Sequence, residues 1–156
     1  SLSTLEVNAS SSLFKWATTN LTLGWEKNFS ERFYSKLLYV KSNYKSVMSN
    51  ADSLTAFTLT SQINYDQVRA EFIFTPGEKH NIFFGASGIL YGLEPGELLP
   101  NSSASTISQV LIPQERAVEL TLYASDEWRP SEKIAITYGL RYSQFHSLGA
   151  RNVYVY

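Results

Sequence analysis

The stretch from Arg116 to Tyr142 decides the fold, and it reads RAVELTLYASDEW, then RPSEK, then IAITYGLRY. In the two arms, between Val118 and Ala124 and between Ile134 and Tyr142, the even positions are apolar and most of the odd positions are polar. Because successive side chains of a strand point to opposite faces, each arm predicts a β-strand with one apolar and one polar face. The polar segment between the arms predicts a hairpin turn.

Pairing of the two arms must keep even positions opposite even positions, so that one face stays apolar. We expect Trp128 to lie opposite Ile134, which leaves Arg129 to Lys133 as the loop.

The same register makes a prediction for the polar face. It places Tyr123 across from Gly139, where an aromatic ring can cover a glycine backbone. It also places Glu119 diagonal to Arg141.

Composition limits the function classes. The 156 residues include no cysteine, so a disulfide framework and a thiolate metal site are excluded. Hydrophobic residues make up 44%, charged residues 17%, and the net charge is -1, which argues against a nucleic acid as partner.

No apolar run approaches the roughly 18 to 20 residues of a spanning helix, whereas a barrel strand needs only about 9 to 11 alternating residues. The N-terminal segment lacks a signal-peptide pattern, so we expect a processed chain or an internal piece.

Further strands are predicted upstream. Trp16 to Asn28 alternates, and Phe33 to Ser46 is rich in strand formers, although its facing is ambiguous. In Leu54 to Thr75 the apolar parity changes near Asn64 to Asp66, which we interpret as a bulge. The strand from Ile82 to Leu90 keeps parity if position 74 pairs with position 82.

Connections alternate in length along the chain. NFSER (28–32), PGEKH (76–80) and RPSEK (129–133) are short, whereas 43–53 and 92–115 are long and are the likelier ligand or partner contacts. Residues 10–12 and 144–152 are also expected as loops, with NVYVY (152–156) beginning a further strand.

Outer-membrane barrels have short turns at one end and long loops at the other. The aromatic residues near the short turns fit the aromatic girdle of such a barrel: Trp25, Phe29, Phe33, Phe74 and Trp128. The predicted fold class is all-β, an antiparallel up-and-down transmembrane β-barrel segment of about six strands of a larger barrel.

Three segments resemble the β-barrel region of TonB-dependent outer-membrane receptors, especially those of the Bacteroidetes type. They are TNLTLGWEKNFSERFYSKLLYVKSNYKS, SQINYDQVRAEFIFTPGEKHNIFFGA and LYASDEWRPSEKIAITYGLRYSQFHSLG, which together cover most of the chain. The most specific piece is DEWRPSEK followed by YGLRYS, because it combines turn, girdle tryptophan and strand.

The resemblance implies a receptor that takes up a scarce nutrient across the outer membrane of a Gram-negative cell, driven by the TonB complex. Residues 1–156 would then be part of the barrel, without plug domain or TonB box. The implied partners are outer-membrane lipid, the remainder of the barrel and the plug, TonB through the plug region, and a surface lipoprotein as a further candidate. About six strands fall short of the roughly 22 of such transporters, and an open sheet edge is not tolerated in lipid. The chain is therefore expected to be a segment that transports nothing alone.

Catalytic chemistry is not indicated. Ser87 fails the spacing of a nucleophile elbow, and neither His80 nor His146 has ligand spacing to another metal-binding side chain. Asp126 and Glu127 are neighbours in a strand and point to opposite faces, so a boundary charge explains them better than acid–base work. We expect no enzyme activity, no metal and no cofactor.

The predicted faces give two sets of site residues. Candidates for the lumen are Lys36, Glu119, Tyr123, Arg141 and Ser143, which could equally form the wet side of any half-exposed sheet. Candidates for lipid contact are Leu21, Leu23, Trp25, Phe72, Phe74, Ile82, Phe84, Val118, Leu120, Leu122, Ile136, Tyr138 and Leu140.

Two alternatives compete with the receptor segment. One is a small non-transporting outer-membrane barrel of eight strands, completed by the short terminal pieces. The other is a soluble lipid- or ligand-binding β protein whose apolar face points inward, and such a chain would stay monodisperse without detergent.

Overall fold

A computed structural model describes residues 2–9, 12–52 and 54–150 of the chain. These residues form eight strands and no helix: β1 (Leu2–Ala9), β2 (Ser12–Ser30), β3 (Phe33–Asn50), β4 (Phe57–Gly77), β5 (His80–Pro100), β6 (Val110–Leu111), β7 (Glu115–Ser131) and β8 (Ile134–Ala150). The strands make one antiparallel sheet in the order β1-β2-β3-β4-β5-β7-β8, with β6 paired to β5. The all-β, up-and-down architecture predicted by the two-residue periodicity is confirmed.

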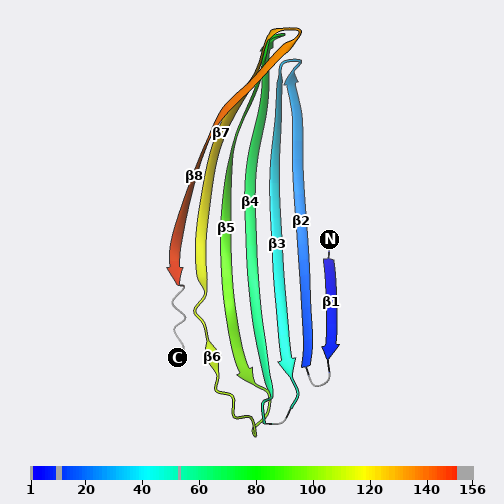
Figure 1. Ribbon diagram of the computed structural model, residues 1–156, viewed down its shortest axis with the longest axis vertical. Helices are drawn as coiled ribbons and strands as arrows, with labels where there is room; N and C mark the ends of the chain where they lie inside the picture. Colours follow the sequence, from blue (N-terminus) through cyan, green and yellow to red (C-terminus); the bar gives the residue numbers. More distant parts are fainter. Residues whose placement is uncertain (1, 10–11, 53, 151–156) are drawn as a thin grey trace.

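The connections are sorted by length between the two ends of the sheet. Tight turns join β2 to β3, β4 to β5 and β7 to β8 at the top of Figure 1, and the long connections lie at the bottom. The six long strands are those expected from the sequence. Of the two short strands, β6 was not predicted, and β1 was expected only in the eight-stranded alternative that uses the short terminal pieces as strands.

All three tight turns are built alike. Each closes with a pair flanking two turn residues: Ser30 with Phe33, Gly77 with His80, and Ser131 with Ile134. Just before each closing pair the register shifts, because the incoming strand carries one more residue than the outgoing strand. A bulge of this kind strengthens the local twist of the strand that enters the turn.

The predicted register of the β7–β8 hairpin is wrong by two residues. Trp128 pairs with Ile136 rather than Ile134, and only Glu132 and Lys133 form the turn. A shift of two preserves the parity of every side chain, so the apolar alternation alone cannot distinguish the two registers. The bulge at the turn selects the observed one.

The bulge predicted near Asn64 to Asp66 is also wrong. There β4 pairs without interruption with β3 and with β5, and the irregularity lies between Thr60 and Gln62, where β5 accommodates an extra residue at Pro95 and Gly96. The apolar parity of β4 changes because apolar side chains move to the other face, and not because the backbone slips.

The strands are longer than the alternation predicted. β3 and β5 continue into the expected long loops, as far as Asn50 and Pro100, and β8 continues through most of the expected loop 144–152. Hydrogen bonds link the β3–β4 connection to the β5–β6 connection. Ser105 Oγ donates to the Ala56 carbonyl (2.8 Å), and Thr106 Oγ1 donates to the Leu54 carbonyl (3.0 Å). The serine pair 10–11 and the NVYVY segment lie outside the described residues.

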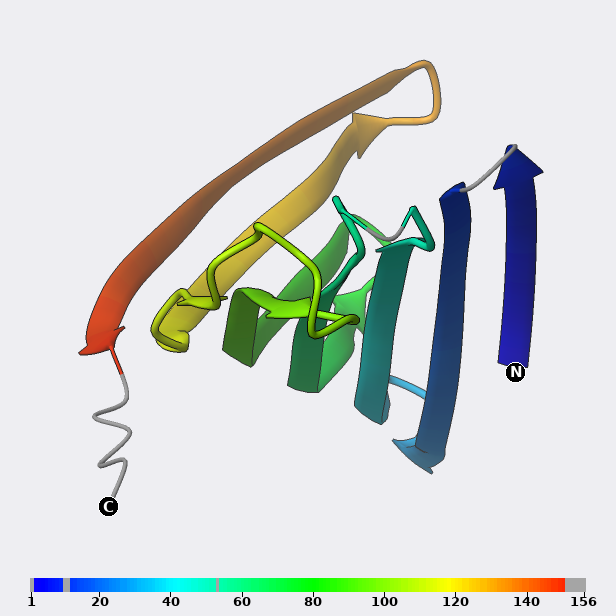
Figure 2. The same ribbon diagram turned by 90° about the horizontal axis from the view of Figure 1, so that it is seen from below.

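The sheet is open and has no apolar core of its own. Its outermost strands, β1 and β8, stand at opposite ends of the array in Figure 2 and do not pair. Among the described residues the only buried hydrophobic ones are Ala56 and Ala117. The apolar side chains of the strands therefore remain at the surface.

Candidate functional site

The pairing register sorts the predicted site residues onto two faces. Residues that pair share a face, and one cross-strand row contains Lys36, Glu71, Gly85, Tyr123 and Arg141. The five lumen candidates all lie on this side, which we call the polar face. The lipid candidates all lie on the other side, which we call the apolar face, in rows such as Trp25–Leu37–Ala70–Ala86–Leu122–Tyr142.

The facing of β3, which its sequence leaves ambiguous, follows from this pairing. Leu37 and Tyr39 pair with Trp25 and Leu23 on the apolar face. Their competitors, Leu38 and Val40, pair with Gly24 and Thr22 and so lie on the polar face.

A hollow of about 680 Å³ lies in the polar face across β4, β5, β7 and β8. We call it the polar hollow. Its side chains are mostly hydrogen-bonding ones of both charge signs, among them Gln67, Arg69, Glu119, Thr121 and Arg141. Such a lining suits a polar ligand, which needs a few well-placed partners for orientation.

Tyr123 crosses the polar hollow over a glycine, as expected, but over a different one. It pairs with Gly85 of β5, and its hydroxyl donates to Glu71 Oε1 (3.2 Å). A Cβ atom at Gly85 would lie 2.5 Å from the Tyr123 hydroxyl and 2.5 Å from the Ala70 carbonyl oxygen, so only glycine fits. Gly139 instead pairs with Ser125.

Lys36 and Arg69 of the polar face form ion pairs. Lys36 contacts Glu26 (2.7 Å), and Arg69 contacts Glu71 (3.4 Å). The predicted diagonal between Glu119 and Arg141 is absent, since Glu119 pairs with Phe145 and accepts a hydrogen bond from Tyr91 (3.2 Å).

Arg141 differs from these two cations. Its Nε donates to Ser143 Oγ (3.4 Å), and it has no carboxylate partner among the residues that the structure describes.

The apolar face carries the aromatic side chains that flank the tight turns. Trp25, Phe29 and Phe33 follow one another in edge or tilted contacts, with centroids 6.3 and 5.7 Å apart. Phe33 continues the series to Phe72, which stacks on Phe84 at 5.1 Å. A continuous aromatic row therefore crosses four strands near the short-turn end.

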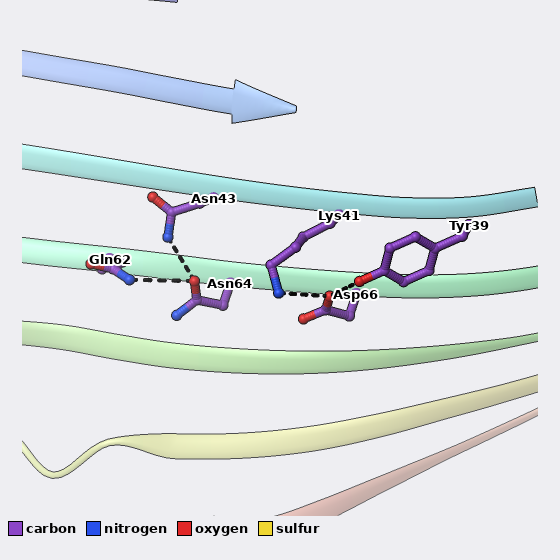
Figure 3. A network of polar contacts seen from close by, with 6 residues as sticks. All are labelled: Tyr39, Lys41, Asn43, Gln62, Asn64 and Asp66. Carbon is purple, nitrogen blue, oxygen red and sulfur yellow. Dashed lines mark hydrogen bonds and ion pairs between the residues drawn. The ribbon is translucent and has the colours of Figure 1, made fainter. Parts of the chain in front are cut away.

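At the other end of the apolar face the side chains become polar (Figure 3). Tyr39 Oη donates to Asp66 Oδ1 (2.8 Å), and Lys41 Nζ contacts the same oxygen (3.2 Å). One step further from the tight turns, Asn43 Nδ2 donates to Asn64 Oδ1 (2.6 Å). We call this group, with Gln62, the polar network. The Tyr39 hydrogen bond, opposed by partial burial and aided by Lys41, lowers the pKa of the Asp66 carboxyl.

His80 and Asp126 have a role that the sequence did not indicate. His80 Nδ1 lies 2.7 Å from Asp126 Oδ2, the Tyr138 hydroxyl donates to the same oxygen (2.8 Å), and the His80 ring stacks on Trp128. The pair is a polar contact beside the girdle tryptophan. Within the described residues no three side chains of His, Cys, Asp or Glu gather as a metal site, and no helix is long and apolar enough to cross a membrane.

Ser87 lines the polar hollow on β5, and His146 lies in β8 opposite Val118. Asp126 and Glu127 lie on opposite faces, as their adjacency predicts.

Sequence reasoning missed two features: the polar network, whose residues are scattered over two strands, and Gln67, which is 6% exposed at the floor of the hollow. Only the even parity of Gln62, Asn64 and Asp66 could have revealed the network.

The chain was compared with family models, with curated proteins and with solved structures, and no match was found in any of the three.

Proposed function

We propose that this chain is a segment of the β-barrel of a TonB-dependent outer-membrane receptor that takes up a nutrient. In this assignment the apolar face contacts lipid and the polar face lines the lumen. The remainder of the barrel and a plug complete the protein, which receives energy from TonB through the plug region.

The observation that carries the proposal is the limited height of the apolar band. On β7 the apolar face runs from Val118 to Trp128 and is interrupted only by Asp126, whose carboxylate contacts His80 and Tyr138. Its length agrees with the roughly 9 to 11 residues that a tilted strand needs to cross a bilayer. Aromatic side chains bound the band at the tight turns, and the polar network bounds it on the other side. A soluble sheet packed on a core needs no such boundary.

The absence of a core favours lipid over a soluble ligand-binding fold. Val68 is 60% exposed and Leu122 is 59% exposed, although both lie in the middle of long strands. Exposed apolar patches of this extent mark a surface that another apolar phase covers. In the soluble alternative these side chains would have to meet across a dry interior.

The open edges favour a segment over a small closed barrel. Among the described residues β8 pairs only with β7, and β2 pairs only with β3 from Leu21 to Ser30, because the described part of β1 covers Ser12 to Thr19. Unpaired strand edges are not stable in hydrocarbon. In the receptor, neighbouring strands of the same barrel would pair with both edges.

Single-cysteine spin labels test the orientation of the faces, since the chain has no cysteine. Labels at Val118, Leu120 and Leu122 should be accessible to oxygen dissolved in the bilayer when the intact protein is embedded in membranes. Labels at Glu119 and Tyr123 should be accessible to a water-soluble nickel chelate. The reverse pattern would place the polar side chains in lipid and would contradict the proposal.

Transport is tested in cells. Uptake of the nutrient should stop when TonB is deleted and should persist when an unrelated energy-coupling protein is removed. Uptake that is independent of TonB would favour a simple pore. A surface lipoprotein, if one exists, should be captured by cross-linkers placed in the long connection 101–109, on the opposite side from the tight turns.

A further inference from the structure

We propose that the polar hollow binds a short peptide with free ends, whose carboxylate contacts Arg141, whose amine contacts Glu119 and whose backbone amide contacts Gln67. The inference deepens the proposed function by naming a solute for the lumen, and it rests on the polar face enclosing that lumen.

The first observation is the unpaired amide of Gln67. The residue is 6% exposed and lines the hollow, yet its side chain makes no hydrogen bond among the described residues. Its amide atoms are not among the side-chain atoms that are buried without a partner, so they open onto the hollow and can reach a ligand. A primary amide offers a donor and an acceptor together, which matches the N–H and C=O groups of a peptide backbone.

The second observation is the distribution of charge around the hollow. Arg69 and Glu71 neutralise each other, and the Tyr123 hydroxyl also contacts Glu71, so this trio needs no ligand. Among the described residues, Arg141 uses one donor, to Ser143, and Glu119 accepts one hydrogen bond, from the Tyr91 hydroxyl. One cationic and one anionic group therefore remain for a ligand, and a guanidinium suits a carboxylate because it can donate two parallel hydrogen bonds.

The third observation is the spacing of these groups. Arg141 pairs with Tyr123, and Tyr123 lies four residues along β7 from Glu119. At about 3.3 Å per residue of strand, the two charges are offset by about 13 Å along the strand direction. An extended peptide covers about 3.3–3.6 Å per residue, so three or four residues span the offset. Gln67 lies on the same cross-strand row as Glu119, through Ile89.

The test measures binding of tetra-alanine with free ends to the purified intact protein in detergent by titration calorimetry. Arg141→Gln should weaken binding at least ten-fold, because the carboxylate loses its charged partner. Arg129→Gln is the matched control, since Arg129 lies outside the hollow and pairs with Glu127. Tetra-alanine with a C-terminal amide lacks the carboxylate. Its binding to the unaltered protein should be as weak as the binding of tetra-alanine with free ends to the Arg141→Gln variant.

A second pair of variants tests the amide. Gln67→Leu should weaken binding several-fold, whereas Gln144→Leu on the apolar face should not. The inference is overturned if tetra-alanine does not bind at millimolar concentration, if the two arginine variants behave alike, or if a neutral trisaccharide binds more tightly than the peptide.

The spin-label pattern separates this inference from the proposed function. If the spin labels on the apolar face lie in lipid but the peptide does not bind, only the peptide inference is rejected. If the peptide binds but the Leu120 label is in water, only the membrane assignment is rejected.

Discussion

Leu122 and Tyr123 are neighbours in β7 and lie on opposite faces of the sheet. The two faces differ in how many of their side chains have partners within the protein. On the polar face Tyr123 covers Gly85 and donates to Glu71, and Thr121 is buried with a hydrogen bond to Ser143. On the apolar face Leu122 lies above one sheet layer with nothing over it. The polar face satisfies most of its groups itself, whereas the apolar face depends on an external apolar phase. In the proposed function the polar face therefore carries specificity and the apolar face carries insertion.

The largest predicted effect comes from placing a charge at the centre of the apolar face. Leu122→Arg should destabilise the bilayer-embedded protein by about 2–4 kcal/mol, because an arginine at the midplane loses its hydration. Urea titration of the protein in lipid vesicles measures the change.

Thr22→Arg is the matched control for this variant. Thr22 is exposed on the polar face of β2, so its replacement should cost far less. Equal losses in the two variants would show that the faces do not differ in environment.

The next effect concerns the packing of the polar face. Gly85→Ala should destabilise the protein by about 1–3 kcal/mol, since the added Cβ collides with the Ala70 carbonyl and forces the Tyr123 ring away from Glu71. Gly24→Ala is the control on the same face, where the nearest atom to the added carbon is Leu38 Cδ1 at an ordinary 3.6 Å. Thermal unfolding of both variants measures the difference, and a neutral Gly85→Ala would mean that the Tyr123 ring is free to move.

The sequence predicted the faces of the sheet better than its registers. Apolar alternation in β7 and β8 requires even positions to face even positions, and the structure obeys this rule. Every shift by two satisfies the rule equally, so the position of Trp128 depended on the turn. The bulge between Trp128 and Ser131 has no apolar signature, and the prediction therefore failed there by two residues.

The candidate site divides in the same way. Parity correctly predicted which face of the sheet carries the five lumen candidates. It did not predict which side chains contact them, because those contacts depend on the register. Gln67 was missed because its burial arises from neighbours on β3 and β5 that lie far away in the sequence. The polar network was misinterpreted as a bulge, since a change of the apolar face and a backbone slip leave the same parity signal in β4.

The smallest predicted effect concerns the polar network, where the apolar band ends. Asp66→Asn should destabilise the protein by about 0.2–1 kcal/mol at neutral pH, the range of partly exposed ion pairs, because it removes the charge that Tyr39 and Lys41 contact.

The loss caused by Asp66→Asn should depend on pH. The pKa of Asp66 is lower in the folded chain than in the unfolded chain, so its contribution is complete above the unfolded value of about 4 and disappears as the pH falls through the folded value. Denaturant titrations between neutral and acidic pH should therefore show the variant and the parent converging in acid. A constant difference at all pH values would mean that the network does not depend on the Asp66 charge, and the boundary of the apolar band would then rest on its amides alone.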